Sequence, residues 1–215
     1  MWKVVAVLVA LAVAGPASAR VFDGCTAAQA KVAGAALDGA QELALRGAAA
    51  VGDSRPFLQW FGPFSAAHGE EVRRGLKAIH ATLAADGLRV VCLGRRAPDC
   101  QGGTFAFIRF DRPRAIHLCP SFFGMPVMAD ALAGRAPIAY GTREGTIIHE
   151  LSHFPFTAGT GDDCYGREDC RDLAKRDPAT AVGTADSFQY YAEDALLAFW
   201  LANPRAPLAD APGAR

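Results

Sequence analysis

The segment His149–His153, which reads H-E-L-S-H, constrains the fold of this chain more than any other feature. On a helix, residues four positions apart share one face, so both imidazoles can bind one ion with Glu150 beside them. Ile147 and Leu151 supply an apolar side for such a helix, and Pro155 cannot continue it. The pattern therefore predicts a helix over about residues 143–154 that carries a zinc site; a helix with two chance histidines is the alternative.

A catalytic zinc site needs a third protein ligand and one open position for water. One continuation of H-E-x-x-H places a glycine and then a histidine further along, but Phe156 and Gly159 occupy those two positions here. A glutamate from a later helix is a second source, for which Glu168 and Glu193 are available. An aspartate on the turn after the helix is the third, and Asp162 lies there.

The segment Gly159–Gly166 reads G-T-G-D-D-C-Y-G and fits the pattern G-T-x-D-x-x-Y-G. Following H-E-x-x-H, it resembles the aspzincin metallopeptidases, the family of deuterolysin and peptidyl-Lys metalloendopeptidase. Further segments resemble landmarks of that family in the same order: Cys25, Trp60-Phe61-Gly62, Gly103-Thr104-Phe105-Ala106, Leu118-Cys119, Ala185-Asp186 and Tyr191-Ala192-Glu193.

The resemblance implies a zinc-dependent endopeptidase that acts on polypeptide substrates with one catalytic Zn²⁺ ion. By that resemblance, His149, His153 and Asp162 are the zinc ligands. Glu150 is then the general base that takes a proton from the zinc-bound water and delivers it to the leaving amine. Tyr165 donates a hydrogen bond to the oxyanion, whose charge develops only in the transition state.

The resemblance also implies a substrate preference, through two positions in the last expected helix. In the lysine-specific branch, an aspartate and a glutamate three residues later line the pocket for the residue after the cut bond. Asp186 matches the first position, but Gln189 occupies the second. We therefore expect cleavage before Lys, with Arg as a second candidate and with weakened selection because one carboxylate is missing. A helix N-cap is the alternative role for Asp186.

The chain has six cysteines and no C-x-x-C pair, which favours disulfides over a zinc knuckle. Six cysteines allow 15 pairings, and the residues alone do not choose among them. The resemblance favours Cys25–Cys92 and Cys100–Cys119, which leaves Cys164 and Cys170 for each other. This third bridge departs from the family pattern and would stiffen the loop that carries Asp162.

The N-terminus reads as a secretory signal over residues 1–19. Lys3 precedes the apolar run Val4–Ala14, and Ala17-Ser18-Ala19 fits an A-x-A cleavage site. We expect residues 20–202 to form the metallopeptidase domain, residues 203–215 to be a disordered tail, and the product to be secreted or periplasmic. No later stretch is long and apolar enough to anchor the chain in a membrane.

The chain has no net charge, with 22 basic and 22 acidic residues, which argues against a nucleic-acid partner. Among enzymes, a zinc amidase acting on another amide is an alternative. A catalytically inactive zinc-binding structural or interaction protein is the alternative from another class. It has no use for Glu150, because a structural site prefers four closed ligands. We expect a monomer.

Hydrophobic periodicity and turn residues predict a single zincin-like α+β domain, mainly helical, with a small antiparallel sheet and an active-site helix that carries H-E-x-x-H. Residues 60–63 are expected to form an aromatic loop. The expected helices span 26–50, 67–85, 143–154, 166–176, 178–183 and 185–202, and the expected strands span 89–93, 104–110 and 115–118.

Overall fold

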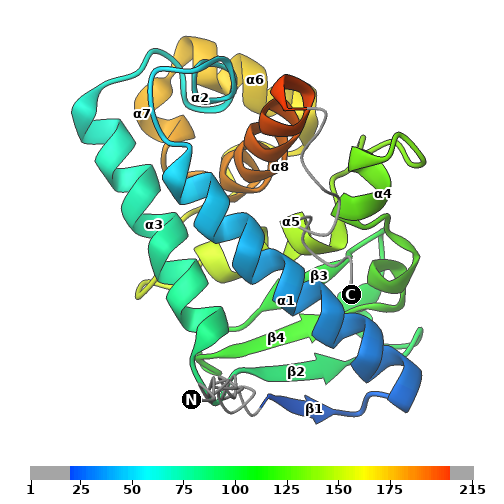
Figure 1. The fold of residues 1–215 in the computed structure, drawn as a ribbon. Helices are drawn as coiled ribbons and strands as arrows, with labels where there is room; N and C mark the ends of the chain where they lie inside the picture. Colours follow the sequence, from blue (N-terminus) through cyan, green and yellow to red (C-terminus); the bar gives the residue numbers. More distant parts are fainter. Residues whose placement is uncertain (1–19, 204–215) are drawn as a thin grey trace, which may run out of the picture.

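The computed structural model describes residues 20–203, and the predicted signal segment and most of the predicted tail lie outside that range. Its sheet has the strand order β1 (Val21–Asp23), β2 (Arg89–Cys92), β4 (Ala115–Leu118), β3 (Ala106–Ile108). Figure 1 shows the sheet at one end of the molecule and, at the other, the helices α2 (Arg55–Phe61), α6 (Gly166–Arg176), α7 (Pro178–Ala181) and α8 (Ala185–Ala202). Within residues 20–203, no helix is long and apolar enough to cross a membrane.

The predicted helical domain with a small sheet is confirmed, but the sheet is mixed rather than antiparallel. Only β3 and β4 pair antiparallel, with Phe107 opposite His117. The pairs β1–β2 and β2–β4 are parallel, with Phe22 aligned to Val90. Parallel neighbours need a long crossover, and three helices between β1 and β2 provide one. Short apolar runs predict strands without indicating their direction, and β1, with three residues, was not predicted.

The helices largely agree with the sequence prediction. Their bounds are α1 (Ala27–Ala49), α2 (Arg55–Phe61), α3 (Ala66–Ala84), α4 (Met128–Leu132), α5 (Arg143–Ser152), α6 (Gly166–Arg176), α7 (Pro178–Ala181) and α8 (Ala185–Ala202); two short 3₁₀ turns cover Pro98–Cys100 and Pro120–Gly124. The first long helix begins with a capping box, in which Thr26 and Gln29 exchange side-chain and backbone hydrogen bonds.

The expectation of an aromatic loop at residues 60–63 was wrong for its first half, because α2 occupies residues 55–61. Ser54 caps this short helix by accepting a hydrogen bond from the Phe57 backbone N–H. Gly62 ends it with φ of +76°, a conformation that residues with a Cβ rarely adopt. Burial of Phe57, Trp60 and Phe61, each 0% exposed, stabilises a helix that its seven residues alone would not support.

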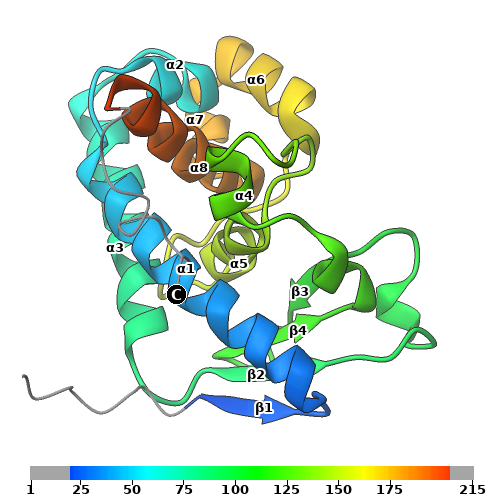
Figure 2. The same cartoon turned by 45° about the vertical axis from the view of Figure 1, so that its right-hand side comes forward.

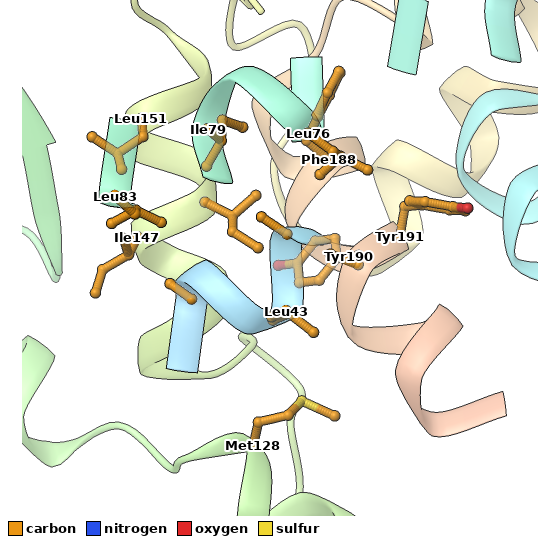
Figure 3. Close-up of a cluster of buried hydrophobic side chains, with 14 of the residues drawn as sticks. Leu43, Leu76, Ile79, Leu83, Met128, Ile147, Leu151, Phe188, Tyr190 and Tyr191 are labelled. Carbon is orange, nitrogen blue, oxygen red and sulfur yellow. The ribbon is translucent and has the colours of Figure 1, made fainter. Parts of the chain in front are cut away.

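The core lies between α1, α3, α5 and α8, with α5 central (Figure 2). Figure 3 shows how apolar side chains from these helices meet: Leu43 from α1, Leu76, Ile79 and Leu83 from α3, Ile147 and Leu151 from α5, and Phe188 from α8. Each is almost fully buried, and burial of such a side chain stabilises the fold by about 1.5–3 kcal/mol. This packing holds α5 on three sides and leaves its histidine-bearing face toward β3 and the cavity.

The structure contains the two disulfides that the resemblance favours and also the third bridge, which pairs the two remaining cysteines. Cys25–Cys92 joins the chain before α1 to the end of β2, and Cys100–Cys119 joins a 3₁₀ turn to the end of β4. Cys164–Cys170 joins the loop after α5 to α6. The described residues contain no free cysteine.

Candidate active site

The N-terminus of α5 is fixed by a buried carboxylate from α8. Glu193 Oε1 accepts hydrogen bonds from the Thr142 backbone N–H at 2.7 Å and from the Thr142 hydroxyl at 2.9 Å. The Thr142 hydroxyl oxygen in turn accepts from the Gly145 N–H at 3.0 Å and caps the helix. A Cβ on Gly145 would lie 2.0 Å from Glu193 Oε1, so this close approach requires glycine. The active-site helix therefore has a fixed starting point.

Three side chains converge beside the C-terminal turn of α5. Nε2 of His149 lies 3.4 Å from Asp162 Oδ1, and Nε2 of His153 lies 3.5 Å from the same oxygen. Among residues 20–203, His149, His153 and Asp162 form the one group of three possible ligands, with donor atoms within 4.8 Å of one another. The other candidate third ligands do not join them, because Glu168 is exposed on α6 and the Glu193 carboxylate binds Thr142 and Arg167.

Hydrogen bonds at the far side of each imidazole determine which nitrogen can bind a metal. Nδ1 of His149 lies 2.8 Å from Asp186 Oδ1, and Nδ1 of His153 lies 2.9 Å from the Thr160 carbonyl oxygen. A carbonyl or an ionised carboxylate can only accept, so Nδ1 carries the hydrogen in both rings. When both rings are neutral, their Nε2 lone pairs face Asp162 Oδ1, and this donor set of two imidazoles and one carboxylate fits zinc.

The environment perturbs the pKa of both histidines. Burial lowers the pKa of His149, but the hydrogen bond with Asp186 and the charges of Glu150 and Asp186 outweigh burial and raise it to about 9. Burial is also the main cause that lowers the pKa of His153. The field around His149 thus favours a cation at this position, which a bound metal ion could supply in place of the proton.

Glu150 lies beside these ligands and is buried, with 6% of its surface exposed. Burial raises its pKa to about 7, and the nearby charge of His149 and the backbone N–H of Ile108 oppose that shift. A carboxyl group with a pKa near neutrality can both accept and return a proton at physiological pH. The site therefore holds a group suited to general base and general acid chemistry.

Tyr165 stands at the rim of the site and is 63% exposed. Partial burial and a hydrogen bond from its hydroxyl to the Asp162 carboxylate raise its pKa to about 12. The phenol consequently keeps its proton at any physiological pH and remains a hydrogen-bond donor.

Asp186 is buried, and both of its carboxylate oxygens have partners. Besides His149 at Oδ1, the Gly166 backbone N–H donates to Oδ2 at 2.6 Å. The alternative that Asp186 caps the last helix was wrong, because Thr184 holds the N-cap position of α8 and Asp186 lies within its first turn. Its contact with His149 was not expected from the sequence.

Gln189 lies one turn further along α8 and faces the same cavity. Its Nε2 donates to the Tyr140 carbonyl at 3.4 Å. A Cβ on Gly141 would meet this amide nitrogen at 1.8 Å, so Gly141, with φ of +86°, leaves room for the Gln189 side chain.

A cavity of about 840 Å³ opens over these residues, and every site residue expected from the sequence lines it. These residues are His149, Glu150, His153, Asp162, Tyr165, Asp186 and Gln189. One wall consists of the glycine-rich turn at Gly102 and Gly103 and of β3, the edge strand next to α5. Such a strand edge can pair with an extended chain.

Sequence reasoning missed the groups that orient the ligands. Thr160 belongs to the G-T-x-D pattern, but the sequence assigned it no role. In the structure its carbonyl oxygen accepts a hydrogen bond from His153 Nδ1, and its hydroxyl lies 2.6 Å from the Ser152 hydroxyl. The sequence does offer a signal, because metal-binding imidazoles almost always donate their second N–H to a nearby acceptor. That rule indicates that acceptors exist without identifying them.

Comparisons with known proteins agree with this geometry. The aspzincin family model, described as lysine-specific metallo-endopeptidase, matches residues 46–193. An extracellular protease of Aeromonas hydrophila is 34% identical over 174 residues, which are 79% of this chain and 46% of that protein. A peptidyl-Lys metalloendopeptidase of Pleurotus ostreatus is 30% identical over 178 residues, which are 80% of this chain and 96% of that protein. This chain thus spans about half the length of the first relative and nearly all of the second.

A solved structure, a zinc peptidase from Grifola frondosa, superimposes with a TM-score of 0.67 at 24% sequence identity. The match covers 79% of this chain and 97% of that chain. At this identity the similarity shows a shared fold.

Proposed function

Because this chain belongs to the aspzincin family of metallo-endopeptidases, we propose that it hydrolyses internal peptide bonds of polypeptides with one zinc ion. The observation that carries the proposal is the convergence of two Nε2 atoms and the Asp162 carboxylate in an open cavity beside buried Glu150. His149, His153 and Asp162 would hold the ion. When bound, zinc lowers the pKa of a water molecule and polarises the scissile carbonyl.

Glu150 is the proposed general base. Its pKa of about 7 lets it accept a proton from the attacking water while the peptide carbonyl is attacked. The same carboxyl group then returns that proton to the nitrogen of the leaving amine. Glu150 lies in α5 next to Leu151, whose buried side chain packs the helix against the core. The helix therefore fixes the position of Glu150 relative to the two histidines.

Tyr165 is the proposed donor to the oxyanion. Its exposed hydroxyl, which bonds to Asp162 in the structure, can instead donate to a carbonyl oxygen that gains charge in the transition state. The outer edge of β3 offers backbone groups to an extended substrate, which would bring a peptide bond past Glu150.

For substrate preference we propose Lys, with Arg as a second candidate, on the C-terminal side of the cut bond. Asp186 and Gln189 line the cavity and supply one carboxylate and one amide for a cationic side chain. His149 and the Gly166 N–H donate hydrogen bonds to the Asp186 carboxylate and partly offset its negative charge. Gln189 carries no charge, so selection for Lys should be less strict than in a pocket with two carboxylates.

We propose that the protein acts outside the cytoplasm, in the periplasm or in the medium. We also propose that it acts as a monomer. Three disulfides within residues 20–203 suit an oxidising compartment, and the signal segment at residues 1–19 would direct export. The Aeromonas relative is itself named an extracellular protease.

Mass-spectrometric mapping of cut sites in a denatured protein mixture tests this function. The zinc-loaded protein should cut before Lys, a chelator should abolish the cuts, and Glu150→Gln should lower the rate by about 10²–10⁴-fold while zinc stays bound. Chelator-sensitive cuts at other residues would retain the endopeptidase and discard the Lys preference. Absence of cuts by a folded, zinc-loaded sample would refute the endopeptidase and favour the amidase or the binding protein.

A further inference from the structure

The segment from Asp162 to Tyr165 supplies one proposed ligand and the proposed oxyanion donor, yet its backbone has little support. Among the backbone–backbone hydrogen bonds that the described residues form outside their helices and strands, none reaches residues 162–165. Support begins on either side of the segment. Before it, the Gly161 N–H donates to the Gly183 carbonyl at 2.8 Å, and after it, the Gly166 N–H donates to Asp186 at 2.6 Å.

The Cys164–Cys170 disulfide fastens the middle of this segment. Cys164 lies between Asp162 and Tyr165 in the chain, and its sulfur is bonded to that of Cys170 on α6. Cys170 is 0% exposed and Cys164 is 7% exposed, so the bridge is packed into the protein beneath the loop. The bridge is the one covalent constraint between this loop and a helix in the described residues.

The helix that receives the bridge is itself held firmly on α8. Arg167, in the first turn of α6, forms ion pairs with Glu193 at 2.9 Å and with Asp194 at 2.9 Å. Its guanidinium also lies 4.5 Å from the centre of the Tyr190 ring. Since Glu193 in turn binds Thr142, the N-cap of α5, the ligand loop is tied through α6 and α8 to the helix that carries the two histidines.

We propose that the Cys164–Cys170 disulfide is a positioning element of the metal site, which holds Asp162 Oδ1 near both histidine Nε2 atoms. The proposal rests on the proposed function, because it concerns the same metal site. With the bridge closed, Asp162 can move little relative to α5, so little ordering remains to be completed when the ion binds. Tyr165, the next residue after Cys164, is positioned by the same constraint.

A disulfide that serves only global stability is expected to close a long loop, and Cys164–Cys170 closes a short one. The Cys164–Cys170 bridge spans a sequence separation of 6, whereas Cys25–Cys92 spans 67. In the chain-entropy account, a short closed loop restricts the unfolded chain less than a long one. The effect of Cys164–Cys170 should therefore be local to the loop that it closes.

The test compares zinc affinity without any substrate, by competition with a chromophoric chelator. The double variant Cys164→Ser/Cys170→Ser should bind zinc about 10–100-fold more weakly than the wild type, the range found when groups that support a metal ligand are lost. Its circular dichroism should remain that of the folded protein. As a matched control, Cys25→Ser/Cys92→Ser should lower the melting temperature further and leave the zinc affinity of the folded protein unchanged.

Equal zinc affinities of the folded Cys164→Ser/Cys170→Ser variant and the wild type would overturn the proposal. A wild-type chain that binds no zinc would instead refute the metal site itself, so the two failures are distinguishable. If the serine variant does not fold, Cys164→Ala/Cys170→Val keeps apolar side chains at these buried positions and is measured in its place. Failure of both variants to fold would show a requirement of the whole fold and would also overturn a positioning role.

Discussion

Asp186→Asn should weaken metal binding. The substitution replaces one carboxylate oxygen, which accepts a hydrogen bond, with an NH₂ group, although both oxygens of Asp186 face N–H donors. In the wild type, Nδ1–H of His149 points at Oδ1 and the Gly166 N–H points at Oδ2. An asparagine has one oxygen and one NH₂ group, so one of these donors must face the NH₂ group. Either Gly166 loses its acceptor, or His149 moves its hydrogen to Nε2 and loses the lone pair that would bind the ion.

The structure sets the size of this effect. A hydrogen bond to a charged group contributes about 1.5–3 kcal/mol. Since about 1.4 kcal/mol corresponds to a tenfold change in an equilibrium constant, the zinc dissociation constant should rise about 10–100-fold. Asp163→Asn removes the same charge next to Asp162, but its side chain has only a 3.4 Å contact with Thr184, so its effect should be much smaller.

Chelator competition on both variants, followed by kinetics on peptides with Lys or Ala after the cut bond, separates two roles of Asp186. A positioning role predicts weakened zinc binding and equal loss of activity on both peptides once zinc is limiting. If zinc affinity stays at the wild-type level while only the Lys peptide is affected, our reasoning about His149 is refuted and Asp186 is a substrate-pocket residue.

Three further predictions concern other parts of the fold. Gly145→Ala should destabilise the protein by about 3 kcal/mol or more in urea unfolding, because its Cβ would displace the buried Glu193 carboxylate from its partners; Gly94→Ala, with nothing within 4 Å, is the control. Gln189→Glu should raise the ratio of kcat/KM for Lys over Arg or Ala peptides, and an unchanged ratio would contradict our assignment of the pocket. Burial raises the pKa of Glu144 from 4.5 to about 7, so its contribution to stability is full below about pH 4.5 and is lost as pH rises through about 7. Glu144→Gln should make the free energy of unfolding depend less on pH between pH 5 and 8. If the slope of that free energy against pH stays as in the wild type, the raised pKa of Glu144 is contradicted.

Local patterns along the chain were sufficient for the long helices. The helices α1, α3 and α8 agree with prediction to within one residue at each end, because apolar spacing and capping residues act over a few positions. The short helix α2 was missed because tertiary burial of Trp60 and its neighbours stabilises it. Strand direction was missed because it depends on which distant segments pair.

In the candidate site, too, local sequence patterns predicted some residues and tertiary contacts decided the others. The spacing of His149 and His153 on a helix is a local property, and the resemblance of the following motif to the aspzincin pattern added Asp162 and Tyr165, so all four could be proposed from the sequence. Two contacts that fix the active-site helix and its first histidine come from far along the chain: Asp186 lies 37 positions from His149, and Glu193 lies 51 positions from Thr142. No periodicity predicts such contacts, since they arise only when α8 packs against α5. The sequence by itself thus determined the helical framework and the candidate metal ligands, whereas tertiary packing decided which distant carboxylate contacts His149, because hydrogen-bond partners are chosen by proximity in space.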